Sequence, residues 1–110
     1  MEEPTEFLKK VEDIIEENLA NPLLNGAYIA NKMNTNRMQL HRYLKTLRGL
    51  PVGRLIKYKR IEYAKNELIG TKKHIYIISK EVGISNPTHF AKIFKAIVGI
   101  SPKAFRQENN

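Results

Sequence analysis

Residues 40–49 read Leu-His-Arg-Tyr-Leu-Lys-Thr-Leu-Arg-Gly, and residues 90–99 read Phe-Ala-Lys-Ile-Phe-Lys-Ala-Ile-Val-Gly. In both stretches a large apolar residue recurs after four positions, a cation follows the first of these by two, and a glycine ends the stretch. Upstream, Ile29-Ala30 and Ile78-Ser79 each place a small residue after a large apolar one. A repeat that keeps core spacing and cation positions together indicates one supersecondary unit used twice.

The basic charge of the chain is concentrated after its first twenty residues. The 110 residues carry a formal net charge of +8. Residues 1–20 hold seven acids and two lysines, whereas residues 21–110 hold 17 bases and four acids, a net charge of +13. Such an excess is typical of a protein that binds phosphate groups. The alternative interpretation is a basic, solvated surface that has no polyanionic partner.

Several other functional classes lack the residues that they require. The absence of cysteine excludes a disulfide framework and a cysteine metal site. The three histidines are scattered and no Gly-rich phosphate loop occurs, so we expect no enzyme activity, no metal and no cofactor. No apolar run approaches the roughly 20 residues of a membrane span, so we expect a cytoplasmic protein with no membrane contact by this segment. RNA binding is disfavoured because no Gly-x-x-Gly loop or aromatic-rich sheet motif occurs. A module that docks on an acidic protein is the remaining rival.

The predicted fold class is all-α, with about seven helices and two helix-turn-helix units joined by a long connecting helix. Proline and glycine fall at helix boundaries, and no long alternation of apolar and polar residues occurs. We expect helices at about 4–20, 26–33, 37–47, 52–69, 75–82, 87–98 and 101–105. Residues 1–51 would hold the N-terminal helix and the first unit, 52–70 the connecting helix, and 71–110 the second unit with a C-terminal helix.

Each unit has the outline of a helix-turn-helix, with a short helix, a tight turn and a basic amphipathic helix. Asn34 and Gly83 are residues that tolerate the left-handed backbone of such a turn. Ile29 lies 11 residues before Leu40, whereas the equivalent residues of the second unit are 12 apart, so its turn is one residue longer. The exposed face of each second helix is free to enter the major groove of DNA.

From about residue 7 to residue 106, the chain resembles the DNA-binding domain of the AraC/XylS family of transcription regulators. The most specific motifs are Ile78-Ser79, Val82-Gly83-Ile84, His89 to Lys95, Val98 to Pro102, and Ala104-Phe105-Arg106. Arg60-Ile61, Ala64 and Leu68 match the connecting helix of that family. The sequence departs from the family pattern at Asn34, Leu44, Ser79 and Ile84. The resemblance implies two recognition helices, at about 37–47 and 87–98, in adjacent major grooves.

The resemblance also implies which side chains meet the DNA bases. The base-contacting positions of the family fall on Met38, His41, Arg42, Pro87, Thr88, His89, Ala91 and Lys92. Arg42 and Lys92 can donate to guanine O6 and N7, and Met38 can touch a thymine methyl group. Pro87 and Ala91 offer apolar contact alone, so we expect the second unit to read fewer bases directly.

A second set of residues is expected to contact the DNA backbone. It consists of Asn36, Arg37, Lys45, Arg48, Asn86 and Lys95. Asn36 and Asn86 are placed as helix N-caps, where backbone N–H groups attract phosphate. The pair Lys72-Lys73 is typical of a solvated turn, with backbone contact as the alternative.

The first predicted helix, with Glu6 to Ile15, resembles the start of the C-terminal output domain of hybrid two-component regulators. We therefore expect an output domain of a transcription regulator, either an activator or a repressor, whose partners are double-stranded DNA and RNA polymerase. The same resemblance implies a sensor or receiver domain in the full-length chain.

Overall fold

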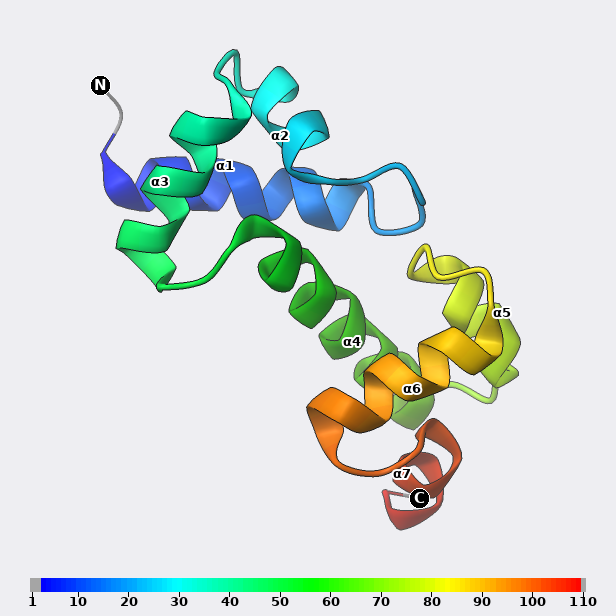
Figure 1. The fold of residues 1–110 in the computed structure, drawn as a ribbon. Helices are drawn as coiled ribbons and strands as arrows, with labels where there is room; N and C mark the ends of the chain where they lie inside the picture. The colour runs from blue at the N-terminus through cyan, green and yellow to red at the C-terminus, as the bar shows by residue number, and fades with distance from the viewer. Residues whose placement is uncertain (1–2, 110) are drawn as a thin grey trace. The chain divides into compact units, whose positions relative to one another are not determined.

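A computed structural model describes residues 3–109, and within them it contains seven helices and no strand (Figure 1). The helices are α1 (Pro4–Glu17), α2 (Gly26–Lys32), α3 (Arg37–Arg48), α4 (Val52–Gly70), α5 (Ile75–Glu81), α6 (Pro87–Val98) and α7 (Pro102–Glu108). The predicted all-α fold is confirmed.

Packing divides the chain into two compact units. Of the described residues, the first unit comprises 3–18 together with Leu23–Lys57, and the second comprises Leu19–Pro22 together with 58–109. The boundary falls inside α4, which is one continuous helix. Each unit therefore holds one helix-turn-helix pair, α2 with α3 or α5 with α6.

The core of the first unit forms where α1 meets the helix-turn-helix pair. Val11 and Ile15 of α1 are fully buried, as are Leu40 and Leu44 of α3. The helix α1 ends at Glu17, three residues before the expected end. The side-chain amide of Asn18 donates to the carbonyl of Ile14 over 2.7 Å, and the backbone of Asn18 has left the helical region.

Close packing in the first unit also explains one glycine. A Cβ on Gly26, the first residue of α2, would lie 2.8 Å from Cγ1 of Val52. Both residues are buried. A side chain at residue 26 would therefore require Val52 or α2 to shift.

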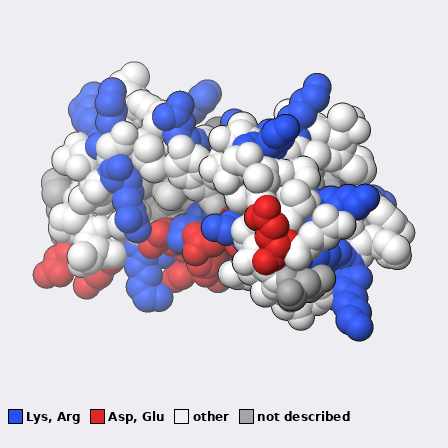
Figure 2. Space-filling view, turned by 90° about the horizontal axis from the view of Figure 1, so that it is seen from below, with Lys and Arg blue, Asp and Glu red and all other residues white. Residues whose placement is uncertain are grey.

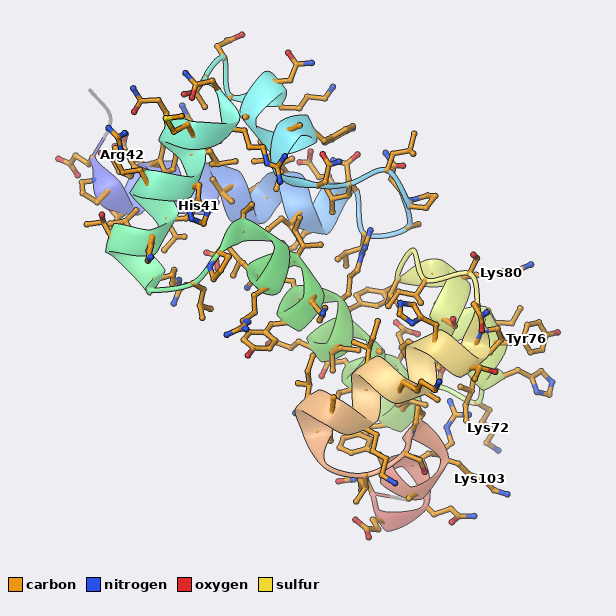
Figure 3. The ribbon with its side chains drawn as sticks, viewed as in Figure 1. His41, Arg42, Lys72, Tyr76, Lys80 and Lys103 are labelled. Carbon is orange, nitrogen blue, oxygen red and sulfur yellow. The ribbon has the colours of Figure 1, made fainter. Side chains whose placement is uncertain are left out.

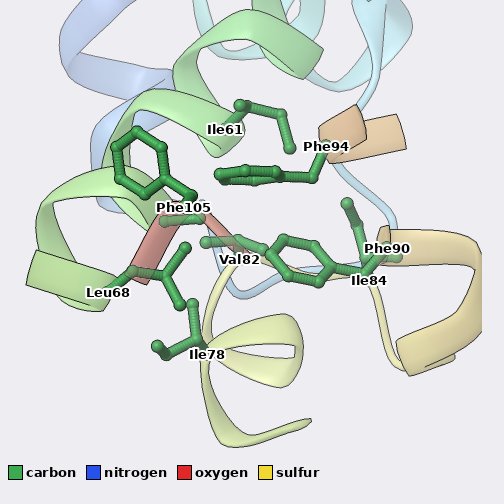
Figure 4. Packing of buried hydrophobic residues seen from close by; sticks show 9 residues of the cluster. Ile61, Leu68, Ile78, Val82, Ile84, Phe90, Phe94 and Phe105 are labelled. Atoms are coloured by element: carbon green, nitrogen blue, oxygen red, sulfur yellow. The ribbon is translucent and has the colours of Figure 1, made fainter. Parts of the chain in front are cut away.

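The second unit is built around aromatic rings from α6 and α7 (Figure 4). The ring centroids of Phe90 and Phe94 are 5.9 Å apart. The ring of Phe105 meets that of Phe94 edge-on, with 5.5 Å between the centroids. Aliphatic side chains from α4, from α5 and from the residue that ends α5 surround these rings; they are Ile61, Leu68, Ile78 and Val82. Burying such side chains is the main favourable contribution to folding in a helical unit of this size.

The turn of the second unit is held by contacts with the segment before α2. Gly83 adopts a left-handed φ of 77°, and a Cβ there would lie 2.5 Å from the carbonyl oxygen of Leu19. Arg60 lies against the same glycine and donates from Nη2 to the carbonyl of Asn21 over 2.8 Å. Burial lowers the pKa of the Arg60 guanidinium. Gly83 is thus required both by its backbone angle and by the space around it.

The two turns repeat each other in their hydrogen bonds. The N–H of Thr35 donates to the carbonyl of Ala30, and the N–H of Ile84 donates to that of Ser79, both over 2.9 Å. The preceding residue is left-handed in each turn, with φ 55° at Asn34 in the first unit. The buried hydroxyl of Ser79 makes a further hydrogen bond to the carbonyl of Ile84, which has no equivalent at Ala30.

The predicted extra residue of the second turn is located after this shared hydrogen bond. Thr35 is followed directly by the N-cap Asn36, whereas Ser85 separates Ile84 from the N-cap Asn86. The equivalent residues of α2 and α5 are therefore 49 positions apart, and those of α3 and α6 are 50 apart.

Candidate nucleic-acid interface

The exposed face of α3 brings together three of the predicted contact residues. Leu40 and Leu44 hold the opposite face in the core. Met38, Arg42 and Lys45 recur at spacings of four and three, which places them along one side of the helix. All three are exposed, and 70% of the Met38 surface is accessible, which is unusual for so apolar a side chain.

The exposed face of α6 repeats this arrangement. Phe90 and Phe94 occupy the core, and Thr88, Lys92 and Lys95 share the opposite side with the same spacing. These three residues are exposed and stand at the positions equivalent to those just described on α3. The structure thus presents two similar faces, each with a cation at the centre and a lysine one turn further on.

The remaining predicted base-contacting residues flank these two faces. His41 lies beside Arg42 on α3, where Figure 3 labels both, and it is exposed. On α6, Pro87 and His89 are exposed in the first turn, whereas Ala91 is half-buried. A base could reach Ala91 only at the edge of the second face.

The two asparagines predicted for the DNA backbone both act as helix caps. The Asn36 carboxamide oxygen accepts from the N–H of Gln39 over 2.9 Å. The Asn86 oxygen accepts from the N–H groups of Thr88 and His89 over 2.9 and 3.1 Å. Because these oxygens are engaged, a phosphate would meet the side-chain NH₂ group of each asparagine or the remaining N–H groups of the helix end.

Most cations of the two faces are available for a ligand. Within residues 3–109, no carboxylate lies within 4.0 Å of the cationic groups of Arg37, Arg42, Lys45, Lys92 and Lys95. Arg48 differs because its Nη2 donates to Glu12 of α1 over 3.1 Å. That pair is partly exposed, so its contribution to stability is small and a phosphate could compete for the arginine.

Gln39 also lies on the exposed side of α3, although it is not among the contact residues predicted from the sequence. It occupies the third position of α3, as His89 does in α6, and both backbone N–H groups bind the cap asparagine. The Gln39 side chain is exposed and borders a shallow hollow that Arg42, Tyr43 and Thr46 complete. Aligning the two repeats from their cap asparagines would have identified Gln39 from the sequence.

The acidic residues have a different distribution from the cations. On the face that Figure 2 draws, Asp and Glu side chains gather in a few groups, whereas Lys and Arg side chains project at many places. Seven of the eleven acids of the chain lie within its first twenty residues. No acid lies between Gly26 and Lys59, the segment that includes α2 and α3. A polyanion that approaches α3 therefore meets few repelling charges.

The described residues contain no group of three or more His, Cys, Asp and Glu side chains that could hold a metal ion. Among the same residues, no helix has both the length and the apolar character that a membrane crossing requires. The best-defined chemistry of the described surface is therefore that of the two cationic faces.

Comparisons with known proteins agree with this arrangement. The family described as "Helix-turn-helix domain" matches residues 29–108. The bifunctional transcriptional activator/DNA repair enzyme AdaA of Bacillus subtilis is 30% identical over 103 residues, which are 94% of this chain and 48% of AdaA. The chain therefore spans about half the length of that relative.

Two solved structures share the fold along nearly the whole chain. One is a transcriptional regulator from Chromobacterium violaceum, described as an AraC-type DNA-binding domain-containing protein. It has a TM-score of 0.86 and 26% identity, with 93% of this chain and 90% of that chain covered. The other is the C-terminal domain of the two-component response regulator yesN from Fusobacterium nucleatum. It has a TM-score of 0.85 and 27% identity, with 92% and 98% covered.

Proposed function

Because this chain belongs to the AraC-type helix-turn-helix family of DNA-binding domains, we propose that it binds specific double-stranded DNA sequences within a transcription regulator. The observation that carries this proposal is the repeated face of α3 and α6, exposed and lined by cations without a carboxylate partner among residues 3–109. In this proposal α3 and α6 occupy adjacent major grooves of one duplex.

The proposed roles of the side chains follow from their chemistry. Arg42 and Lys92 donate to guanine O6 and N7, and His41 donates to a base acceptor. Met38 touches a thymine methyl group, while Thr88 and His89 are the polar contacts at the start of α6. Arg37, Lys45 and Lys95, with the two capped helix ends, contact phosphates and fix the register.

We further propose that the chain is the output domain of a larger regulator. Support comes from AdaA, of which it spans about half, and from the yesN domain, which is the C-terminal part of a response regulator. A sensor or receiver domain would then control it, and activation would involve contact with RNA polymerase. In this proposal the domain itself catalyses no reaction, and it acts in the cytoplasm.

A selection from a random duplex pool, followed by binding at several salt concentrations, tests the proposal. If six to ten phosphates are neutralised, log K against log salt should have a slope of roughly −5 to −9 for the selected site. Recovery of no preferred sequence, or a slope shallower than about −2, would contradict it. The control is an acidic protein whose net charge is similar to that of the duplex. A protein-docking module would bind this acidic protein about as tightly as it binds the duplex.

A further inference from the structure

A further cationic surface lies outside the two recognition helices, on and beside α5, which is the first helix of the second helix-turn-helix pair. Tyr76 and Lys80 of α5 are four residues apart and therefore share a side of the helix. Lys72 precedes the helix, and Lys103 lies on α7. Figure 3 shows all four side chains on the same edge of this unit, and each is exposed. We call these four residues the α5 flank.

Two acids close in sequence to the α5 flank pair with a lysine outside it. Glu67 of α4 and Glu81 of α5 both pair with Lys73, whose Nζ lies 3.0 Å from each carboxylate. Within residues 3–109, no carboxylate lies within 4.0 Å of Lys72, Lys80 or Lys103. Lys73 therefore pairs with both of these acids, and the other three ammonium groups remain available to bind an anion.

The polar groups beside these lysines suit the same kind of ligand. Half of the Tyr76 surface is exposed, and its ring stacks with that of His74 at a centroid distance of 5.6 Å. The tyrosine hydroxyl can donate a hydrogen bond, as can the lysines. Donors from Lys and Tyr side chains are common contacts to DNA phosphate and sugar groups.

The first unit lacks this surface at the equivalent positions. The alignment is fixed by the N-cap residues Asn25 and His74, which begin helices of equal length. Leu23, Ala27 and Asn31 stand where the second unit has Lys72, Tyr76 and Lys80. After the turns the offset is 50, as the C-caps Gly49 and Gly99 show, and Gly53 stands where the second unit has Lys103. The two units therefore differ in a complementary way, since the unit with fewer donors toward bases has the more cationic flank.

We propose that the α5 flank binds the sugar-phosphate backbone of the duplex next to the segment that α6 reads. This inference rests on the proposed function. The first helix of a helix-turn-helix crosses the DNA backbone while the second lies in the groove, so α5 is the helix from which such contacts are expected. Backbone contacts here offset the poor base recognition by Pro87 and Ala91, and they are independent of sequence.

The test uses the full chain and the selected duplex at several salt concentrations. The double variant Lys72→Gln/Lys80→Asn changes exposed residues and places at residue 80 the side chain found in the first unit. We expect the salt slope to become shallower by about 2, because two phosphate contacts are lost. The selected sequence should stay the same. The charge-matched control Lys9→Gln/Lys10→Gln, on the acidic helix α1, should leave the slope unchanged.

A shortened duplex locates the contact. Removing about half a helical turn of DNA beyond the α6 segment should weaken the unaltered protein and leave the double variant unaffected. If the double variant keeps the slope of the unaltered protein, the α5 flank does not bind the backbone, although the proposed function stands. If the unaltered protein itself has a slope shallower than about −2, both proposals fail. The single variant Lys80→Asn, which should change the slope by about 1, checks the result should the double variant fold poorly.

Discussion

In the proposed function, recognition depends on single side chains, and the surroundings of each side chain decide whether it is available to DNA. Arg42 lies at the centre of the α3 face, exposed and without a carboxylate partner within residues 3–109. Arg48, six residues later, donates to Glu12. Two arginines of one helix thus differ in availability because of a partner 36 residues away in sequence. No local pattern could have predicted that pairing.

Replacing Arg42 should affect both affinity and sequence preference. Arg42→Ala should cost about 1–3 kcal/mol on the preferred duplex and relax the preference at one base position. Lys95→Ala should weaken binding evenly across sequences, because a phosphate contact carries no sequence information. Competition binding with single-base variants of the site measures both effects. Unchanged affinity and preference in Arg42→Ala would mean that α3 is not a recognition helix.

Gln39 provides a second residue-scale prediction. An exposed glutamine beside Arg42 can form paired hydrogen bonds with adenine N6 and N7. Gln39→Ala should therefore reduce discrimination at one adenine by about 1–3 kcal/mol while the helix remains stable. Gln107→Ala, at the other glutamine of the chain, is the matched control and should have no effect. If Gln39→Ala and Gln107→Ala select the same DNA sequence, Gln39 does not contact a base.

At the scale of the elements, the helices could be predicted well because apolar spacing and cap residues act locally. The boundaries of α6 agree with those expected, since Asn86-Pro87 and Gly99 mark them in the sequence. The predicted end of α1 was wrong by three residues, because the side-chain amide of Asn18 donates a hydrogen bond to the carbonyl of Ile14 and the helix stops there. The contact of Gly83 with Leu19 joins residues 64 positions apart, and periodicity carries no information on it.

The turn glycine of the second unit should be far less tolerant of substitution than a helix-ending glycine. Gly83→Ala should lower the free energy of unfolding by about 2–4 kcal/mol, because the left-handed backbone and the clash with Leu19 add together. Gly49→Ala has a similar φ of 68° but no atom within 4 Å of the new Cβ, so about 1 kcal/mol is expected. Urea unfolding of both variants compares them. If both variants lose the same free energy of unfolding, the surroundings of Gly83 do not exclude a side chain.

At the scale of the whole molecule, the repeat predicts the division into two units, whereas the route of the chain between them could not be foreseen. Leu19–Pro22 packs with the second unit although it lies between α1 and α2 of the first. The chain therefore passes between the units three times, once within the continuous helix α4. These connections limit how far apart two DNA sub-sites can be while one molecule binds both.

Changing the spacing of the sub-sites should therefore abolish simultaneous binding. Inserting half a helical turn of DNA between them should lower affinity towards the non-specific level. A full-turn insertion should not restore it, because the short connections cannot lengthen. Binding to both altered duplexes with the original affinity would indicate that one unit alone reads DNA.

Footprinting of the selected site shows whether both repeated faces bind one duplex. A monomer should protect two major-groove segments about 34 Å, or one helical turn, apart in an asymmetric, non-palindromic sequence. Arg42→Ala should weaken protection of the segment assigned to α3, and Lys92→Ala that of the segment assigned to α6. A single protected segment that responds to only one of the two substitutions would contradict the account.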